Sequence, residues 1–463
     1  MPRNVVFLCL DSVRLDYFNE NASRLRDLAD IEFSECRTAS SWSVPSHGSF
    51  MTGDLPSEHE SHAYNQSYEH LSQSDTFLDE CSDHMSLGLS ANPYASPDFA
   101  FDDLFDEFIA TRPGKYLPNG MSVDSFGWES DKSGFQLYIE FIREAMRHKN
   151  PGASLANGII QKSRNVIESG PLPRVFDDGV KPISRRLARE VNVAEQPIFA
   201  FANFMEAHEP MEDTFGYTRG LYETPWGWSS GKTDKSSVEN LDGAFVQRYR
   251  DLYSAAIDYL DHQISTLVEE LSAENTTVVI TADHGDNLGY KTDDGLFGHV
   301  GSLSEGLLHV PLLVINPPDC APSGTIEEYV SHLDLPDLLI ALANDEWADI
   351  TTDVLVAESM GKTGWVDDTL TKRSSKFWGR TIRAAYRGST KVEWDSLGDA
   401  YRIELGDSPS SRISKSEIDE PPTWATSEFV DSIDSARKTG LDVRGERNIS
   451  DRVTNRLENL GYR

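Results

Sequence analysis

Val5–Leu10 is apolar throughout, as expected of a strand buried on both faces of a parallel sheet, and similar short runs recur along the chain. The runs are Val5–Leu10, Met85–Ser90, Pro197–Phe204, Thr276–Thr281 and His309–Asn316. Between them lie helical patterns, the clearest over Gln247–Leu271, where apolar residues recur at three- and four-residue steps. Strands alternating with helices predict an α/β fold with a mostly parallel sheet, helices on both faces, and ligands at the carboxyl ends of the strands.

The pattern changes at two places. Residues 111–195 are rich in Gly, Ser and charge, with a helical segment near Phe135–Arg147, which predicts an insertion or lid within a catalytic domain spanning 1–348. From 349 to 463 the apolar runs become shorter and predict a small α+β domain with an antiparallel sheet. Its expected elements are strands at Val354–Ala357, Ile382–Tyr386, Lys391–Trp394 and Tyr401–Leu405, and a terminal helix at Val453–Arg463.

Charge narrows the classes of partner. The chain has 42 basic and 76 acidic residues, a net charge of −34 spread along its length, so binding to nucleic acid or to an anionic membrane is not expected. This excess favours adaptation to high salt, with an ordinary acidic protein as the alternative. No apolar run reaches membrane-spanning length and the start lacks a leader pattern, so we expect a cytoplasmic protein without a membrane span. The oligomeric state cannot be inferred from these features.

Two segments near the start of the chain hold residues that can carry chemistry. Asp11 follows the first run directly, where a carboxylate either caps the next helix or binds a cation. In the segment Ser41–Gly53, Pro45 suits the first turn of a helix and Gly53 its end, which places Ser43 at the helix amino terminus. Ser43 is therefore either a plain N-cap or a nucleophile that attacks a group held by the free N–H donors there.

Asp283 and His284 follow the run Thr276–Thr281, and Gly285 gives the backbone room to turn. Together with Asp11 they would form a mixed oxygen and nitrogen site for one divalent metal ion, with Mn²⁺ or Zn²⁺ favoured and Ca²⁺ the further alternative. A loop salt bridge is the structural alternative. His208 and His299 also come after predicted strand ends, although a single loop histidine is a weak signal.

Together these segments resemble the sulfatase family of the alkaline phosphatase superfamily, over most of the chain. The resemblance rests on NVVFLCLDSVRLDYF, SWSVPSHGSFMTGDLPSEHE, ANPY, FDDLFDEF, FANFMEAHEP, TADHGDNLG, GHVGSLSEGLLHVPLLV, VSHLDLPDLL and LENLGYR. The second of these is similar to the signature of the family, in which a nucleophile precedes x-Pro-Ser-Arg and a later Thr-Gly. Ser43 occupies the nucleophile position.

The resemblance implies a role for each matching residue. The metal ligands would be Asp11, Asp283, His284 and the attacking oxygen of Ser43. His299 would contact the sulfuryl or phosphoryl oxygens, and His208 would lie near the leaving group. The substrate-binding positions would be His47, Asn92 and Tyr94.

Three departures from the family pattern place the chain among members with an unmodified hydroxyl nucleophile. His47 stands where the family has the arginine that guides formylglycine formation, Ser12 replaces a frequent second aspartate, and His284 replaces the asparagine or glutamine of calcium-type members. We therefore expect a salt-adapted, haloarchaeal-type sulfatase relative that cleaves sulfate esters of small molecules or glycans. The alternatives are a phosphodiesterase, a phosphonate hydrolase, a phosphoglycerol-transferase-like enzyme, or a catalytically silent relative that binds an anionic glycan.

Overall fold

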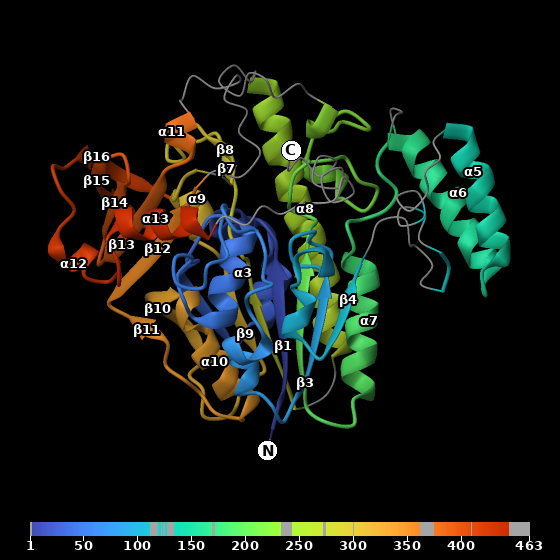
Figure 1. Cartoon of the computed structure of the whole chain (residues 1–463), viewed down its shortest axis with the longest axis horizontal. Helices are drawn as coiled ribbons and strands as arrows, with labels where there is room; N and C mark the ends of the chain where they lie inside the picture. The colour runs from blue at the N-terminus through green and yellow to red at the C-terminus, as the bar shows by residue number, and fades with distance from the viewer. Residues whose placement is uncertain are drawn as a thin grey trace.

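Two sheets organise the part of the chain that the computed structural model describes, namely residues 2–111, 119–121, 123, 126, 134–168, 172–232, 243–271, 275–299, 301–361, 375–408 and 410–443. The larger is nine-stranded and mostly parallel (Figure 1). Its strands, from one edge to the other, are β11 (Thr351–Thr352), β10 (Gly324–Ser331), β2 (Ile31–Arg37), β9 (Leu312–Ile315), β6 (Thr276–Thr281), β1 (Asn4–Leu10), β5 (Ile198–Phe204), β3 (Met85–Ser90) and β4 (Glu107–Ala110). The apolar runs form its centre, since every residue of β5 and β6 is buried.

Helices cover both faces of this sheet. On one face α8 (Gly243–Glu270) packs against α7 (Val180–Val193), α1 (Leu15–Asn21) and α2 (Ser23–Leu28). On the other, α3 (Ser43–Thr52) packs against α10 (Leu335–Ala343), and both lie in front of the sheet in Figure 1. The predicted α/β fold class is therefore confirmed.

Direction and extent differ from the expectation at one strand of the large sheet. The run His309–Asn316 was expected to add a further strand to a parallel set, but only Leu312–Ile315 are extended, and β9 is antiparallel to both β2 and β6. An apolar run shows that a strand is buried, and does not show its direction.

The second sheet is a purely antiparallel meander. Its strands, in order, are β12 (Val354–Met360), β13 (Thr381–Arg387), β14 (Thr390–Asp395), β15 (Ala400–Leu405) and β16 (Arg412–Glu417). Helices α12 (Thr423–Thr426) and α13 (Ile433–Asp442) contact β13. The predicted antiparallel sheet is thus present, while the predicted terminal helix at Val453–Arg463 lies outside the described residues. The division into 1–348 and 349–463 stays a prediction.

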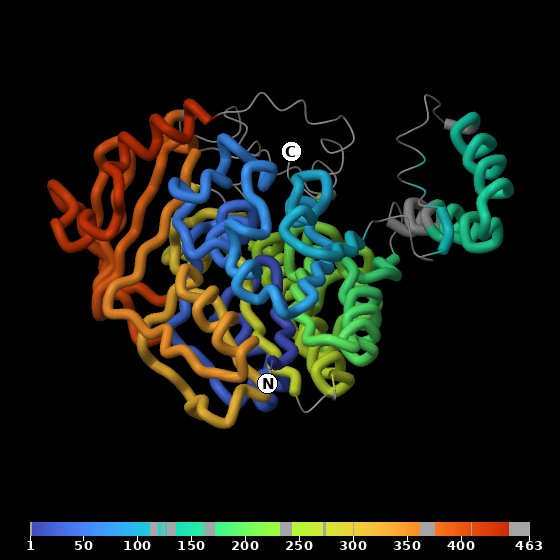
Figure 2. The backbone as a smooth tube through the Cα atoms, turned by 60° about the horizontal axis from the view of Figure 1, so that its bottom comes forward, coloured from blue at the N-terminus to red at the C-terminus, as the bar shows by residue number. Residues whose placement is uncertain are grey.

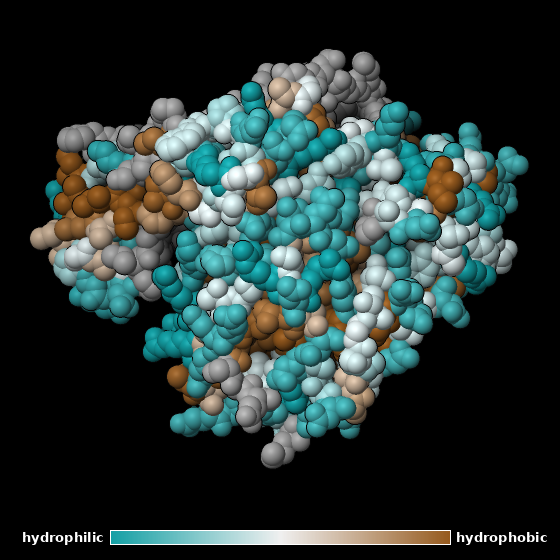
Figure 3. Space-filling view, turned by 180° about the vertical axis from the view of Figure 1, so that it is seen from behind, coloured by the Kyte–Doolittle hydropathy of each residue, from teal (hydrophilic) through white to brown (hydrophobic). Residues whose placement is uncertain are grey.

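Two helices stand apart from both sheets. Helices α5 (Gly134–Arg147) and α6 (Pro151–Glu168) pack against each other to one side of the molecule (Figures 1 and 2). They expose the large side chains of Tyr138, Ile139, Ile142, Met146 and Ile159, and hydrophobic residues show brown at the left in Figure 3. That residues 111–195 act as a lid stays a prediction.

Short elements complete the architecture. They are β7 (Asn287–Leu288), β8 (Phe297–Gly298), α9 (Glu305–Leu308), α11 (Ser375–Trp378) and the 3₁₀ turns at Gln73–Asp75, Phe77–Asp79, Pro97–Phe99, Asp102–Leu104, Arg219–Leu221, Ser230–Lys232 and His332–Asp334. Within the described ranges, none of the helices combines the length and the apolar character needed to cross a bilayer.

A buried histidine behind α3 makes stability depend on pH. The ring of His59 accepts from the backbone N–H of Ser61 at 3.1 Å and lies 3.1 Å from Ser49 Oγ, a pattern that suits neutral imidazole. Burial, with the neighbouring His62 as a smaller cause, lowers the pKa of His59 to about 3. Unfolded His59 binds a proton below its ordinary pKa of about 6.5, whereas the folded protein does not until about pH 3.

We therefore expect stability to fall as the pH drops from about 6.5 towards 3, by up to about 1.4 kcal/mol per unit from this one proton. Denaturant unfolding of wild type and His59→Gln at several pH values measures it. His59→Gln should flatten the dependence, and the exposed-site control His262→Gln should not. Equal slopes for wild type and His59→Gln would refute this assignment.

Candidate active site

Four neighbouring parallel strands end at one edge of the large sheet, and a polar residue stands at each end. Asp11 directly follows β1, Asp283 lies two residues after β6, Asn92 two residues after β3, and Asn203 is the last residue but one of β5. All four are fully buried. Residues far apart in the sequence are thus brought together because the carboxyl ends of parallel strands share an edge.

Two carboxylates and one imidazole converge there. Asp11, Asp283 and His284 each offer a ligand atom, and the three atoms lie within 4.8 Å of one another. His284 Nδ1 is 2.7 Å from the carbonyl oxygen of Gly285, to which it can donate; in that tautomer Nε2, 3.5 Å from Asp283 Oδ2, carries the lone pair. Asp283 Oδ1 accepts from the backbone N–H groups of Ser12 and His284, and Oδ2 has no hydrogen-bond partner. An orphaned carboxylate oxygen beside an imidazole nitrogen fits a cation.

The backbone around these ligands is constrained. Ser12 adopts φ +63°, a conformation that residues with a side chain rarely adopt, and its N–H donates to Asp283 at 3.1 Å. A Cβ on Gly285 would collide with the carbonyl oxygen of Gly306. The sequence pattern had attributed Gly285 to turning of the chain, but close approach of another backbone segment is the requirement seen here.

Ser43 is the first residue of α3, as predicted, and Gly53 ends this helix at φ +82°. Ser43 Oγ accepts a hydrogen bond from Asn92 Nδ2 at 3.0 Å and lies 3.4 Å from His284 Nε2. The same Asn92 nitrogen donates to Asp11 Oδ2 at 2.6 Å. Asn92 thus fixes the serine oxygen beside the carboxylate, at the positive end of a ten-residue helix.

The electrostatics of the two carboxylates favour a bound cation. Burial, followed by repulsion from Asp283, raises the pKa of Asp11. Burial would also raise the pKa of Asp283, but the nearby His284 and His47 hold it below its ordinary value. Keeping negative charge in a buried site needs a compensating positive charge. A divalent ion meets that need.

His208 and His299 lie beside this group. The His299 ring centroid is 4.8 Å from that of His284 and 5.1 Å from that of His208. Burial, and then the neighbouring His284 and His208, lower the pKa of His299. His208 Nδ1 lies 2.6 Å from the carbonyl oxygen of Glu209, which orients its ring.

His47 and Tyr94 lie on different sides of the site. His47 is fully buried against Phe50, and its Nε2 is 3.3 Å from Asp283 Oδ2, so it contacts a candidate metal ligand. The backbone N–H of Tyr94 donates to Asn92 Oδ1, and its buried ring packs edge-on against Trp42. Tyr94 therefore adjoins a residue that hydrogen-bonds to Ser43, and His47 adjoins a candidate metal ligand. Their assignment to substrate binding stays a prediction.

Sequence reasoning missed two residues at the site. Asn203 Nδ2 is 3.4 Å from Asp11 Oδ2, and a lone amide inside the apolar run FAFANF was the available signal. Asp286 Oδ1 lies 3.8 Å from His299 Nδ1, and its other oxygen accepts from Tyr249. Burial, followed by repulsion from Glu209, raises the pKa of Asp286 to about 7. Asp286 stands in the same TADHGDNLG segment as Asp283.

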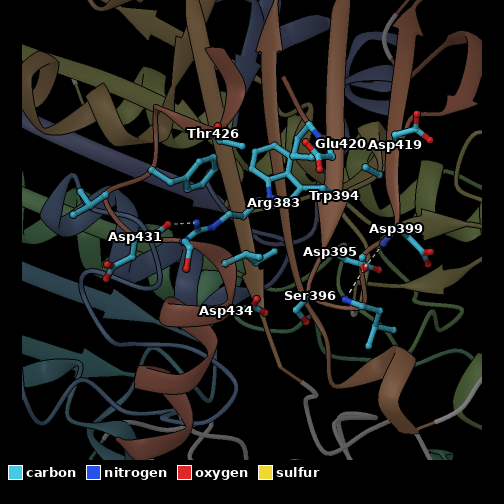
Figure 4. A pocket seen from close by; sticks show the side chains of 18 residues that line it. Arg383, Trp394, Asp395, Ser396, Asp399, Asp419, Glu420, Thr426, Asp431 and Asp434 are labelled. Atoms are coloured by element: carbon cyan, nitrogen blue, oxygen red, sulfur yellow. Dashed lines mark hydrogen bonds between the residues drawn. The ribbon is translucent and has the colours of Figure 1, made fainter. Parts of the chain in front are cut away.

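A cavity of about 700 Å³ lies elsewhere, between the second sheet and α12 and α13 (Figure 4). Trp394 and Phe429 contribute aromatic walls, and carboxylates including Asp399, Asp419 and Asp434 line it. None of the predicted site residues contributes to it.

Comparisons with known proteins agree with this fold. A phosphonate monoester hydrolase from Silicibacter pomeroyi is similar in structure (TM-score 0.59, 15% identity, covering 89% of this chain and 91% of that one). So is a phosphonate monoester hydrolase of Agrobacterium radiobacter (TM-score 0.59, 14% identity, 88% and 90% coverage). A further solved structure, that of a protein called BT4656 in complex with its substrate D-glucosamine-2-N,6-O-disulfate, has a TM-score of 0.57 at 11% identity, with 98% and 99% coverage. These likenesses show the fold.

No curated protein matches the sequence significantly. The model of the sulfatase family matches residues 3–345, which hold all of the site residues described above. The chain therefore belongs to the sulfatase family of ester hydrolases.

Proposed function

We propose that the protein is a metal-dependent sulfatase that cleaves sulfate esters with the unmodified hydroxyl of Ser43 as nucleophile. The observation that carries this proposal is the placement of Ser43 Oγ, at the start of α3, beside the buried group of Asp11, Asp283 and His284. These three residues and the Ser43 oxygen would hold one divalent ion, with Mn²⁺ or Zn²⁺ favoured and Ca²⁺ the further alternative. When bound, the ion would lower the pKa of the serine hydroxyl and offset charge on the ester oxygens.

The residues of the chain would divide the reaction between them. Ser43 releases its hydroxyl proton to solvent, and its Oγ forms a bond to sulfur as the bond from sulfur to the leaving oxygen breaks, which gives a sulfated serine and an alcohol. His208 donates the proton that the leaving oxygen takes up. Water then hydrolyses the sulfated serine and restores the hydroxyl. Backbone N–H groups at the start of α3 stabilise the non-bridging oxygens, with His299 as a further contact.

Asn92 holds the nucleophile during this sequence. Its Nδ2 donates hydrogen bonds to both Ser43 Oγ and Asp11 Oδ2, so it holds the serine oxygen in a fixed position relative to the carboxylate. Its Oδ1 accepts from the backbone of Tyr94, which fixes the amide orientation. His47, beside Asp283, and Tyr94, beside Asn92, would be further residues of the substrate-binding site.

A phosphorus ester is the second candidate substrate. It is favoured by an unmodified serine with His47 at the position of the family arginine, and by two structural neighbours named as phosphonate monoester hydrolases. A phosphodiesterase or phosphoglycerol-transferase-like reaction would use the same Ser43 attack. A silent glycan-binding relative is disfavoured because the whole constellation is present. The neighbour bound to a disulfated glucosamine supports sulfated sugars as a substrate class.

Kinetic assays separate these substrates. Nitrophenyl sulfate, nitrophenyl phosphate, bis-nitrophenyl phosphate and a phenylphosphonate ester would each be tested with Mn²⁺, Zn²⁺ and Ca²⁺. The proposal expects the highest kcat/KM on the sulfate ester. A clear preference for a phosphorus ester would transfer the assignment to the second candidate, and inactivity on all four with every ion would support the silent relative.

The acidic composition predicts that the result of these assays depends on the salt concentration. We propose an intracellular, high-salt setting, because a net charge of −34 is best tolerated where screening is strong. Activity and solubility should rise from dilute buffer to multimolar KCl. Highest activity in dilute buffer, with loss in KCl, would contradict the salt adaptation and leave the chemistry untouched.

A further inference from the structure

A second group of metal-ligating atoms lies directly behind the first. Cys9 lies on β1, two residues before Asp11, which directly follows that strand. Residues two apart along a strand point to the same side, so we expect the side chains of Cys9 and Asp11 to share one face. His47, four residues after Ser43 on α3, is one helical turn along. One ligand atom from each of Cys9, His47 and Asp283 lies within 4.8 Å of the other two, and all three residues are fully buried.

The polar atoms of this group make no hydrogen bonds, although His47 and Asp283 lie within ion-pair distance of each other. Both ring nitrogens of His47 and Oδ2 of Asp283 make no hydrogen bond, although all belong to side chains with 0% exposure. His47 Nε2 is 3.3 Å from Asp283 Oδ2 but is not oriented to hydrogen bond with it. Burying polar atoms without hydrogen bonds is costly, so His47 Nε2 and Asp283 Oδ2, which lie 3.3 Å apart, indicate a missing ligand.

We propose that Cys9, His47 and Asp283 form a second metal site, specific for Zn²⁺ or another borderline-soft divalent ion. Thiolate, imidazole and carboxylate are the ligand types that Zn²⁺ takes in proteins. In a tetrahedral zinc site with bonds of about 2.0–2.2 Å, neighbouring nitrogen and oxygen ligands lie about 3.3–3.6 Å apart. The 3.3 Å between His47 Nε2 and Asp283 Oδ2 has that value.

Charge and proton balance are consistent with the site. Zinc binding would displace the thiol proton to solvent and leave a metal-bound thiolate. Asn203 on β5 is the neighbour of Cys9 in the pairing of β1 with β5. Its side-chain oxygen is buried and has no hydrogen-bond partner, so it is a candidate fourth ligand.

The second site rests on the proposed function only through Asp283, which both sites share. A carboxylate between two ions is typical of two-metal hydrolytic sites, where the ions lie about 3.5–4 Å apart. The inner ion would fix Asp283 from behind and leave the face towards Ser43 to the outer ion. The rival explanation is that His47 only positions Asp283 and binds no metal.

Cobalt substitution tests the proposal without an activity assay. The purified full chain is stripped with a chelator and reloaded with Co²⁺; metal per chain is measured by mass spectrometry, and thiolate-to-cobalt charge transfer by near-ultraviolet absorption. We expect about two ions per chain and a charge-transfer band. Cys9→Ser should lose the band and one ion, and the matched control Cys36→Ser, at a buried cysteine on β2, should keep both.

Asp11→Asn separates this proposal from the proposed function. It should lose the outer ion and keep the band. If circular dichroism shows that Cys9→Ser does not fold, His47→Gln replaces it and should lose one ion with a weakened band. A wild-type protein without the band, or a folded Cys9→Ser protein that binds as much cobalt as wild type, would overturn the second site. One ion per chain with a band that survives Asp11→Asn would instead refute the outer site and support the inner one.

Discussion

Replacing Ser43 with alanine should lower kcat by about 10³- to 10⁶-fold, because it removes the hydroxyl at the first position of α3 and because losing a nucleophile costs that much in comparable enzymes. The metal content should change little, since Asp11, Asp283 and His284 remain. Steady-state kinetics on the best substrate, with metal analysis of the same samples, measures both quantities.

Ser46→Ala is the matched control. Ser46 is equally buried on the same helix but faces Thr38, with Oγ atoms 3.3 Å apart, and should retain activity within a few-fold. Near-normal turnover by the Ser43 variant would end the nucleophile assignment. An equal loss in both variants would attribute the effect to helix packing.

Asp283→Asn should produce the second large effect, a loss of metal affinity of more than about 100-fold with loss of turnover. Even partners outside the metal's own ligands cost about 10- to 100-fold in affinity, and Asp283 is itself one of the grouped ligand atoms. An amide keeps the size of the side chain and removes the charge. Calorimetric titration of the chelator-stripped protein with Mn²⁺ or Zn²⁺ measures the affinity.

Asp261→Asn controls for the loss of a buried carboxylate. Asp261 lies on α8 and accepts from the backbone N–H groups of Arg24 and Leu25, away from the sheet edge. That variant should be less stable but bind metal as wild type does. Unchanged metal affinity in the Asp283 variant would show that the ion, if any, is held elsewhere.

The sequence predicted the site well because its residues follow strands that are recognisable by themselves. The run Thr276–Thr281 (TTVVIT) carries no charge and became β6 with the same bounds, so the end of the strand, and with it Asp283, could be located. Ser43 could be placed because Pro45 and Gly53 mark a helix, and α3 has those limits. Parallel strand ends then bring these residues to one edge.

The strands at the other side of the sheet could not be predicted in the same way. In β10 most side chains are exposed or half-buried, and β2 alternates between buried and half-buried, so neither has a continuous apolar run. The proximity of Cys9 to His47 depends on how α3 seats on the sheet. That is a matter of tertiary packing, which local patterns do not encode.

Anomalous diffraction from crystals loaded with Mn²⁺ or Zn²⁺ tests the central claim most directly, because it locates the ion without reference to activity. The account predicts a strong anomalous peak within bonding distance of carboxylate oxygens of Asp11 and Asp283, of His284 Nε2 and of Ser43 Oγ. A fully loaded crystal whose ion lies away from these side chains, or whose residue 43 oxygen points away from the ion, would contradict it.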